Sequence, residues 1–230
     1  MKVSVLIPCY NEEKTIKKII EKILNVEVEL HEIIVVDDNS FDNSRKIVEE
    51  LSSTHKKIKF FKNNINLGKG SAIRLGLEKV SGDVVIFQDA DLEYNPSEYN
   101  KLLLPFIETD ADVVYGSRFL GGNYSRLHFF WHYIANKLLT TLCNVFTNLN
   151  MTDMETGYKV FKMNILNNIN LKENSFGIEP EITIKLSKKK AIFYEVPISY
   201  QGRSYDEGKK IRLKDAFIAV YCLFKYKFFD

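Results

Sequence analysis

The segment Val84-Val-Ile-Phe-Gln-Asp-Ala-Asp-Leu-Glu-Tyr94 runs from four apolar residues directly into three acids at alternate positions. An apolar run of this length is typical of a buried strand. Residues at i, i+2 and i+4 of an extended chain point the same way, so Asp89, Asp91 and Glu93 are expected to converge beyond the strand end. Oxygen-rich convergence suits Mg²⁺ or Mn²⁺. Acids at a strand end also cap turns, and Asn95-Pro96 is a turn signal, but three alternate acids favour a metal site.

The first half of the chain alternates such apolar runs with longer helical patterns. Strands are predicted at Val3–Ile7, Glu32–Val36, Lys59–Phe61, Val84–Phe87 and Asp112–Tyr115, and helices at Glu13–Leu24, Asp42–Leu51, Gly70–Val80 and Pro96–Ile107. This alternation predicts an α/β fold with a mostly parallel sheet flanked by helices. Ligands of such sheets bind beyond the carboxyl ends of the strands, where the polar loops of this chain gather.

The second half contains a long aromatic helical pattern, Arg126–Thr147, and the acid-bearing turn Thr152–Gly157. Further elements are predicted as a helix near Glu181–Lys189, a strand at Ala191–Val196, a basic loop at Gln201–Lys210 and a closing helix at Lys214–Phe229. Because no repeat or linker interrupts the chain, residues 1–230 are expected to form one domain.

Composition excludes several classes of protein. The 230 residues carry 32 basic and 30 acidic side chains, a formal charge of +2, which argues against a nucleic-acid partner. The three cysteines, Cys9, Cys143 and Cys222, are widely spaced among apolar neighbours and are expected to be reduced core residues of a cytoplasmic protein. We expect neither a signal peptide nor a membrane span, since the apolar runs fall short of the roughly 20 residues that a span needs.

Two further loops on the same edge have both a structural and a functional interpretation. Asp37 and Asp38 end the second strand, where they cap the next helix or accept hydrogen bonds from a nucleoside. Asn66-Leu-Gly-Lys-Gly70 lacks the spacing of a phosphate-binding P-loop, so a tight turn is favoured, with Lys69 near the nucleotide.

The basic loop and the histidines are also ambiguous. Gly202 and Gly208 flank Arg203, and Lys209 and Lys210 follow the second glycine, which suits either a solvated loop or one that closes over a diphosphate. His128 and His132 lie one helical turn apart without the intervening Glu of a metalloprotease. Their aromatic neighbours indicate core packing or an interfacial helix.

Assembled in order, these motifs resemble glycosyltransferase family two, in particular its dolichyl-phosphate and polyprenyl-phosphate sugar transferases. The resemblance covers Val3 to about Ile211. It rests on Val5–Glu12, Ile34–Ser40, Asn66–Gly70, Gly82–Val85, Asp89–Leu92, Gly116–Arg118 and Glu195–Pro197. It implies a GT-A nucleotide-sugar-binding fold, an inverting reaction, and residues 1–120 and 121–230 as donor and acceptor halves.

The resemblance also assigns residues. It implies a nucleoside pocket of Pro8, Tyr10, Glu12, Val36, Asp37 and Asp38, with Asp89 and Ala90 at the ribose and diphosphate. It implies Asp91 as a ligand of Mg²⁺ or Mn²⁺, with Asp89 and Glu93 in the same metal site, although relatives often carry Gln where this chain has Glu93. Arg118, Arg203 and Lys210 match positions that face the donor diphosphate or the acceptor phosphate.

The acceptor implied by the resemblance is a polyprenyl phosphate at the cytoplasmic face of a membrane, contacted peripherally by the aromatic and closing helices. A lipid phosphate needs no general base, whereas a sugar-hydroxyl acceptor would need one, and Asp153 matches that position. The sequence does not decide whether the donor is of the GDP-mannose or the UDP-glucose type. It also does not decide whether the chain has a membrane-protein partner or forms a homo-oligomer. A non-catalytic nucleotide-sugar-binding module and a nucleotidyltransferase are the alternatives from other classes.

Overall fold

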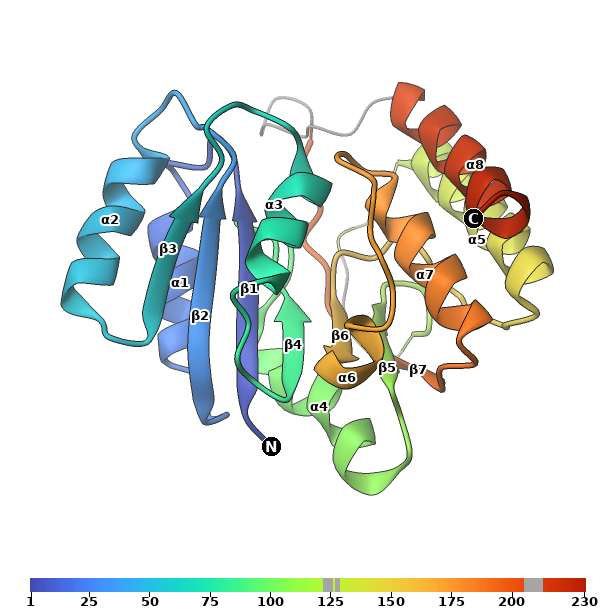
Figure 1. Ribbon diagram of the computed structural model, residues 1–230, viewed down its shortest axis with the longest axis horizontal. Helices are drawn as coiled ribbons and strands as arrows, with labels where there is room; N and C mark the ends of the chain where they lie inside the picture. Colours follow the sequence, from blue (N-terminus) through green and yellow to red (C-terminus); the bar gives the residue numbers. More distant parts are fainter. Residues whose placement is uncertain (122–125, 127–128, 205–212) are drawn as a thin grey trace.

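In the computed structural model of the chain, the described residues are 1–121, 126, 129–204 and 213–230. One sheet of seven strands, ordered β3-β2-β1-β4-β6-β5-β7, runs through the molecule (Figure 1). The strands are β1 (Val3–Cys9), β2 (Leu30–Asp37), β3 (Ile58–Lys62), β4 (Val84–Phe87), β5 (Val113–Ser117), β6 (Lys159–Lys162) and β7 (Phe193–Pro197). Six strands run in one direction and β6 runs against its neighbours β4 and β5. The predicted mostly parallel α/β sheet is confirmed.

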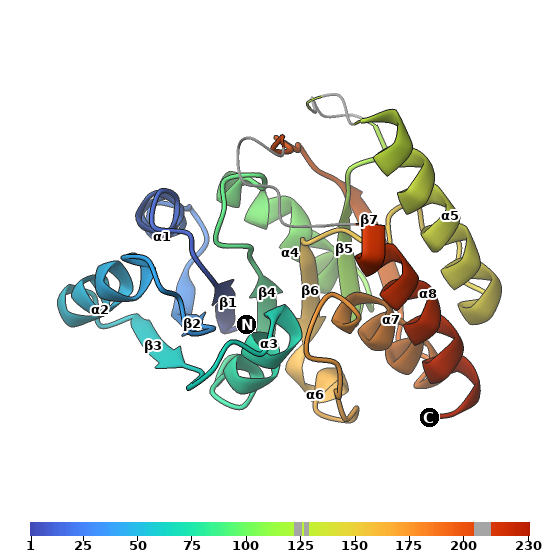
Figure 2. The same ribbon diagram turned by 90° about the horizontal axis from the view of Figure 1, so that it is seen from above.

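Helices cover both faces of the sheet (Figure 2). One face carries α1 (Ile16–Leu24), α2 (Ser44–Thr54), the short 3₁₀ helix η1 (Pro96–Glu98) and α4 (Tyr99–Glu108). The other carries α3 (Lys69–Leu77), α5 (Phe130–Thr147), α6 (Met163–Leu166), α7 (Ile178–Lys188) and α8 (Leu213–Phe228).

Two apolar cores follow from the alternation of side chains along the strands. Val5 and Ile7 of β1 pack toward α1, while Leu6 between them packs toward α3. Helix α1 meets its core through Ile16, Ile19, Ile20 and Ile23, all fully buried and spaced as one helical face. Burying side chains of this size contributes roughly 1.5–3 kcal/mol each before conformational entropy is subtracted. The cysteines Cys9, Cys143 and Cys222 are free and buried, as predicted.

Two local predictions were wrong. Strand β4 ends at Phe87, as predicted, but residues 90–94 bend rather than continue as an extended segment, so the alternate-residue geometry does not orient the acids. Helix α5 begins at Phe130 rather than at Arg126, whose backbone N–H donates to the carbonyl of Tyr200 at 2.8 Å. The remaining helices and strands differ by a few residues at their ends, which is usual for such boundaries.

Strand β6 and helix α6 were not predicted at all. The strand has only four residues, Lys-Val-Phe-Lys, and a lysine at each end hides it from an apolar pattern. Its first lysine, Lys159, is nevertheless fully buried. Because β6 is antiparallel, the residues before it, 152–158, reach the edge where the other strands end. This reversal brings the turn Thr152–Gly157 into the candidate site.

No helix within the described residues combines the length and the apolar character needed to cross a bilayer.

Candidate active site

Four strand ends bring the predicted residues to one edge of the sheet. Tyr10 and Glu12 follow β1, Asp37 and Asp38 lie at the end of β2, residues 88–93 follow β4, and Arg118 follows β5. Residues 198–203 continue from β7 along the same edge, so that Arg203 lies beside the loop after β4. The prediction that one edge collects the polar loops is therefore met by the fold.

Arg203 is the centre of a cluster of acids. Its Nη2 donates to Asp91 at 2.6 Å, its Nε to Glu93 at 3.2 Å, and its Nη1 to both carboxylate oxygens of Glu12 at 3.2 and 3.3 Å. The Arg203 side chain is 20% exposed and the three acids are less exposed still. Burial, together with the neighbouring Glu93 and Asp89, raises the pKa of Asp91 to about 8.

Asp89 faces a different cation. Lys69, at the start of α3, binds Asp89 at 2.9 Å and Glu179 of α7 at 3.1 Å, and Glu179 in turn binds Lys159 of β6. Burial alone would lower the pKa of Lys69, but the two carboxylates raise it. Gly157 packs against Asp89, since a Cβ there would lie 2.3 Å from its Oδ2. Asp89 is thus the partly exposed end of a chain of alternating charges that leads inward to the buried Glu179 and Lys159.

The third ion pair of the edge joins Arg118 and Asp153. The Arg118 Nε and Nη2 donate to the two carboxylate oxygens of Asp153, each at 2.7 Å, and the backbone N–H of Arg118 donates at 3.0 Å. Burial lowers the pKa of Arg118, but the Asp153 carboxylate raises it well above its usual range. The guanidinium also packs over the rings of Phe119 and Tyr200, 5.5 and 5.2 Å from their centroids.

The two acids at the end of β2 have unlike surroundings. The Asp38 carboxylate accepts hydrogen bonds from the side chains of Asn63 and Asn66 and from the backbone of Leu67 and Gly68, and so holds the predicted turn before α3. In Asp37, Oδ2 accepts from the backbone N–H of Ser40, whereas the buried Oδ1 has no hydrogen-bond partner in the part of the chain that the structure describes. Asp37 is therefore the better placed of the two to accept a hydrogen bond from a nucleoside.

The other predicted nucleoside residues divide into surface and core. The rings of Tyr10 and Phe41 meet edge to face with centroids 6.1 Å apart, and the Phe41 side chain is 84% exposed. Val36 and Ala90 are buried and pack in the two apolar cores. Lys210 and His128 lie outside the described residues, so the predicted pairing of Lys210 with a phosphate stays a prediction.

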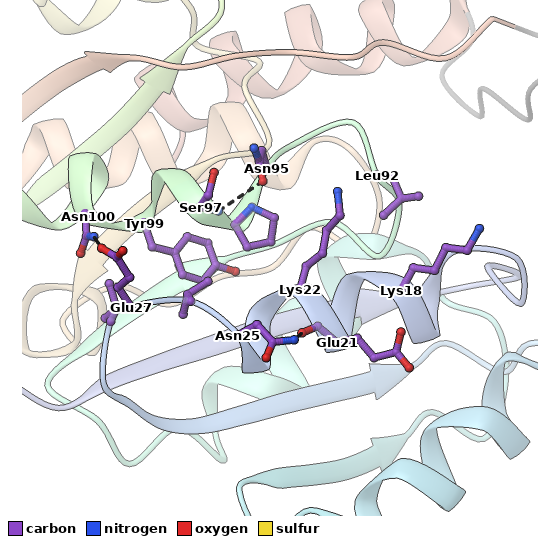
Figure 3. Close-up of a pocket in the computed structure, with 13 residues that line it drawn as sticks. Lys18, Glu21, Lys22, Asn25, Glu27, Leu92, Asn95, Ser97, Tyr99 and Asn100 are labelled. Atoms are coloured by element: carbon purple, nitrogen blue, oxygen red, sulfur yellow. Dashed lines mark hydrogen bonds between the residues drawn. The ribbon is translucent and has the colours of Figure 1, made fainter.

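A groove of about 630 Å³ lies between α1 and the segment that follows the acidic loop (Figure 3). Lys18 and Lys22 extend from α1 toward Leu92 and Asn95 on the facing loop. None of the predicted site residues that the structure describes lines this groove, although Leu92, between Asp91 and Glu93, does. The candidate active site is therefore the charged edge, which the groove adjoins at Leu92.

The predicted metal ligands share the right chemistry but not a common arrangement. Carboxylate oxygens suit a hard divalent ion, yet no group of three or more His, Cys, Asp or Glu among residues 1–121, 126, 129–204 and 213–230 is arranged to hold one. Asp89 is bound to Lys69, while Asp91 and Glu93 are bound to Arg203. The carboxylates of Asp89, Asp91 and Glu93 are therefore suitable ligands for a divalent ion in their chemistry. The guanidinium of Arg203 binds two of them, Asp91 and Glu93.

Sequence reasoning did not identify Glu179 and Tyr200 as site residues. Glu179 is a buried acid in the first turn of α7, and the available signal was Glu179-Pro-Glu181 inside an otherwise apolar helical pattern. Tyr200 donates its hydroxyl to Glu93 at 2.8 Å, and Ser199 donates to Glu98. These bonds hold the segment after β7 against the acidic loop, a long-range pairing that no local pattern reveals.

The fold and the charged edge define an α/β protein with a polar candidate site beyond the carboxyl ends of its parallel strands, and comparison with known proteins assigns the family. A profile of the family described as Glycosyl transferase family 2 matches residues 4–169. The chain belongs to glycosyl transferase family 2, a family of glycosyltransferases. The predicted resemblance is thereby confirmed.

The curated relatives include several transferases. The chain is 31% identical to a dolichol-phosphate mannosyltransferase of Pyrococcus furiosus over 91% of this chain and 59% of the relative. It is 29% identical to an undecaprenyl-phosphate 4-deoxy-4-formamido-L-arabinose transferase of Proteus mirabilis over 93% of this chain and 64% of that protein. A UDP-N-acetylglucosamine–dolichyl-phosphate N-acetylglucosaminyltransferase of Methanococcus voltae is 27% identical, over 96% and 94% of the two chains. The chain thus spans less than two thirds of the length of the first and second of these relatives.

Solved structures share the fold. Glucosyl-3-phosphoglycerate synthase of Mycobacterium tuberculosis, in complex with Mn²⁺, UDP and phosphoglyceric acid, superposes with a TM-score of 0.77 and 20% identity, over 100% of this chain and 79% of that one. The predicted GT-A fold is confirmed by this likeness.

Proposed function

We propose that the chain catalyses inverting, divalent-ion-dependent transfer of a hexose from a nucleoside-diphosphate sugar to a polyprenyl phosphate. The observation that carries the proposal is the edge itself, where three carboxylates surround one cation close to the buried Arg118–Asp153 pair. The names of the relatives, which act on dolichol, dolichyl and undecaprenyl phosphates, support the acceptor.

On the donor side, the protein must stabilise the diphosphate leaving group when its bond to the sugar breaks. The departing diphosphate gains negative charge, and a divalent ion bound by Asp91 with its neighbouring acids would stabilise that charge. The structural neighbour whose complex contains Mn²⁺ and UDP supports this use of the edge. The Oδ1 of Asp37, which has no hydrogen-bond partner among the described residues, would accept a hydrogen bond from the base, and Tyr10 with Phe41 offers aromatic surface in the loops after β1 and β2.

On the acceptor side, the Arg118–Asp153 pair supports a phosphate over a hydroxyl. A hydroxyl acceptor needs a base with a free carboxylate oxygen, but both oxygens of Asp153 accept hydrogen bonds from Arg118. A phosphate monoester is already anionic at neutral pH and needs cations to hold it. Asp153 is then a positioning residue, which holds the guanidinium of Arg118 at the edge.

The surface of α5 and α8 supports a lipid acceptor. These helices lie side by side at one end of the molecule (Figures 1 and 2). Phe146, near the end of α5, contacts both Phe224 and Phe228 near the end of α8, so the carboxyl-terminal ends of the two helices pack together. Exposed apolar residues on them are Phe130, Trp131, Leu138, Val145, Phe217, Tyr221, Phe224 and Phe228. We propose that this surface rests on the membrane that carries the acceptor.

The test is a transfer assay with purified protein, Mg²⁺ or Mn²⁺, and GDP-mannose, UDP-glucose or UDP-N-acetylglucosamine, each with and without polyprenyl phosphate. We expect one donor to yield a lipid-linked sugar together with its nucleoside diphosphate. Asp91→Asn should abolish turnover, whereas Arg45→Ala, which removes an exposed ion pair with Glu49, should not change it.

The negative outcomes of this assay separate the alternatives. Transfer to a soluble sugar hydroxyl in place of the lipid would show that the acceptor assignment is wrong. Nucleotide binding without any transfer would favour a binding module. Stabilisation by a nucleoside triphosphate but not by a diphosphate would indicate a nucleotidyltransferase.

A further inference from the structure

The guanidinium of Arg203 has the contacts that a bound cation would make at this edge. Its three nitrogens lie 2.6–3.3 Å from oxygens of Asp91, Glu93 and Glu12. The acids come from two loops, one after β1 and one after β4, and Arg203 comes from a third segment, after β7. One side chain therefore joins three segments through charge-assisted hydrogen bonds, which are stronger than neutral ones.

The described residues place three acidic side chains around the guanidinium of Arg203, and Asp89 beside them pairs with Lys69. A concentration of acidic side chains at a largely buried site favours binding of a cation with more than one positive charge.

The ion and the guanidinium cannot share the same oxygens. Mg²⁺ binds its oxygen ligands at about 2.0–2.1 Å in near-octahedral geometry, which brings the carboxylates closer together than a guanidinium between them allows. The acids, spread around Arg203, offer no group of three arranged for a metal in the part of the chain described here. An ion that used Asp91 and its neighbours would have to displace the Arg203 side chain.

We propose that Arg203 occupies the cation site of the metal-free protein and competes with the divalent ion for Asp91, Glu93 and Glu12. This inference rests on the metal dependence in the proposed function. It adds a step before donor binding, in which the ion enters and the guanidinium leaves. The released guanidinium stays near the ion, where a diphosphate would be its next partner.

The backbone around Arg203 allows this exchange to be local. Ser199 binds Glu98 through its N–H and its hydroxyl, and Gln201 donates its N–H to the carbonyl of Glu93 at 2.9 Å. Arg126 also binds Tyr200 and Gly202 through its backbone and side chain. The Arg203 N–H and the Tyr200 hydroxyl also donate to the Glu93 carboxylate, at 2.9 and 2.8 Å. The contacts of Ser199, Gln201 and Arg126 do not involve the acidic side chains of the cluster, so they keep the segment in place when the guanidinium moves.

The first test observes Arg203 directly. The chain has only six arginines, so their Nε–H signals are resolvable by NMR, and Arg203→Lys identifies the signal of interest. We expect a protected Arg203 signal in metal-free protein that shifts or exchanges away as Mg²⁺ is added. The Arg118 signal, held by Asp153, is the internal control and should not change.

The second test measures Mn²⁺ binding by calorimetry, without donor or acceptor. If Arg203 occupies the acids nine tenths of the time, it weakens the apparent affinity by about ten-fold, so Arg203→Gln should bind Mn²⁺ about ten-fold more tightly than wild type. Arg203→Lys keeps the charge but has a point-like ammonium in place of the planar fork. We expect its affinity to lie between those of the other two proteins.

The outcomes are distinguishable. Tighter binding in Arg203→Gln with wild-type affinity in Arg203→Lys would mean that only the charge matters, and competition for the acids would be wrong. Mn²⁺ binding to wild type with an unchanged Arg203 signal would overturn the competition while leaving the proposed function intact. If neither wild type nor either variant binds the ion, the competition and the metal dependence in the proposed function are both wrong.

Discussion

Asp153 and Glu155, two residues apart in one turn, are carboxylates in contrasting environments. Asp153 is fully buried and holds Arg118 through both oxygens. Glu155 has a buried Oε1 without a hydrogen-bond partner among the described residues. Burial raises the pKa of Glu155 to about 7, even though nearby Lys159 acts in the opposite direction. Residue type alone does not distinguish these two acids, because their neighbours come from distant segments.

Asp153→Asn should weaken both the fold and the acceptor site. The variant leaves the Arg118 guanidinium buried without its counter-ion, which costs about 3 kcal/mol in the free energy of unfolding. Transfer to polyprenyl phosphate should fall. The transfer rate should still rise with pH as the acceptor phosphate ionises, because that rise does not depend on a protein base. Denaturant unfolding and a pH profile measure the two effects, with Asp83→Asn, an exposed acid bonded to the backbone of Lys2, as control. Loss of the rise with pH would instead assign Asp153 as a general base.

Glu155→Gln should stabilise the protein at alkaline pH. The folded-state pKa of Glu155 is raised, so its contribution is fully present below about pH 4.5 and is lost as the pH rises through about 7. Glutamine avoids this ionisation. The free energy of unfolding of the variant, measured relative to that of wild type, should therefore increase by on the order of 2 kcal/mol as the pH rises from 5 to 8.5. Thermal unfolding at both pH values measures the gain, and a pH-independent difference would contradict it. The exposed Glu49→Gln is the matched control.

At the scale of elements, α5 and α8 show why an apolar helix need not be a core helix. Only Leu139, Thr140 and Cys143 of α5 are buried, while Trp131 is 76% exposed. On α8, Phe217 is 70% exposed. Large exposed apolar side chains on two adjacent helices favour an interaction surface over a core position. Of the two sequence interpretations of these aromatics, core packing is wrong for the exposed rings, and membrane contact stays a proposal.

The membrane proposal predicts the effect of removing two aromatic rings. Trp131→Ser together with Phe217→Ser should weaken binding to vesicles of phosphatidylcholine and phosphatidylglycerol by at least about ten-fold, since each buried ring contributes on the order of 1.5–3 kcal/mol. Sedimentation with the vesicles measures this. Phe41→Ser removes an equally exposed ring from the loop between β2 and α2, elements that lie at the other end of the molecule from α5 and α8 (Figure 1), and should bind as wild type does. Equal binding by all three proteins would exclude this surface as the contact.

At the scale of the whole molecule, buried charges connect the two halves of the chain. Asp89, Lys69, Glu179 and Lys159 alternate in sign and come from the loop after β4, from α3, from α7 and from β6. The sheet joins the same halves, because β6 from the second half pairs with β4 and β5 from the first. The predicted division into donor and acceptor halves remains untested, but the two halves share one sheet.

Lys159→Met should destabilise the whole fold. It leaves Glu179 buried with Lys69 as its remaining cation, at a cost of about 3 kcal/mol in the free energy of unfolding. The double variant Lys159→Met, Glu179→Gln should recover part of that loss, because it also removes the uncompensated charge. Urea unfolding measures both values, and Lys162→Met, at the exposed end of the same strand, is the control. Equal stability of wild type and Lys159→Met would show that the ion pair of Lys159 with Glu179 makes no net contribution to the free energy of unfolding.

Much of the fold could be predicted, because its information is local. The five strands of the first half and the helices between them follow from apolar periodicity, and their loops meet at one edge because parallel strands end together. The glycosyltransferase resemblance followed from short motifs on these loops. Strand β6 could not be predicted, since its four residues carry two lysines and its burial depends on the partner Glu179, 20 residues away.

The sequence by itself determined the class of fold, the family and the set of charged residues at the edge, because these depend on residue type and spacing. The tertiary structure alone decided how those charges pair: Asp89 with Lys69, Asp153 with Arg118, and Asp91, Glu93 and Glu12 with Arg203. The physical reason is that ion pairs form between side chains that the fold brings within a few ångströms. Arg203 and Glu12 are 191 residues apart, a separation that only the packing of β7 and β1 into one sheet can close.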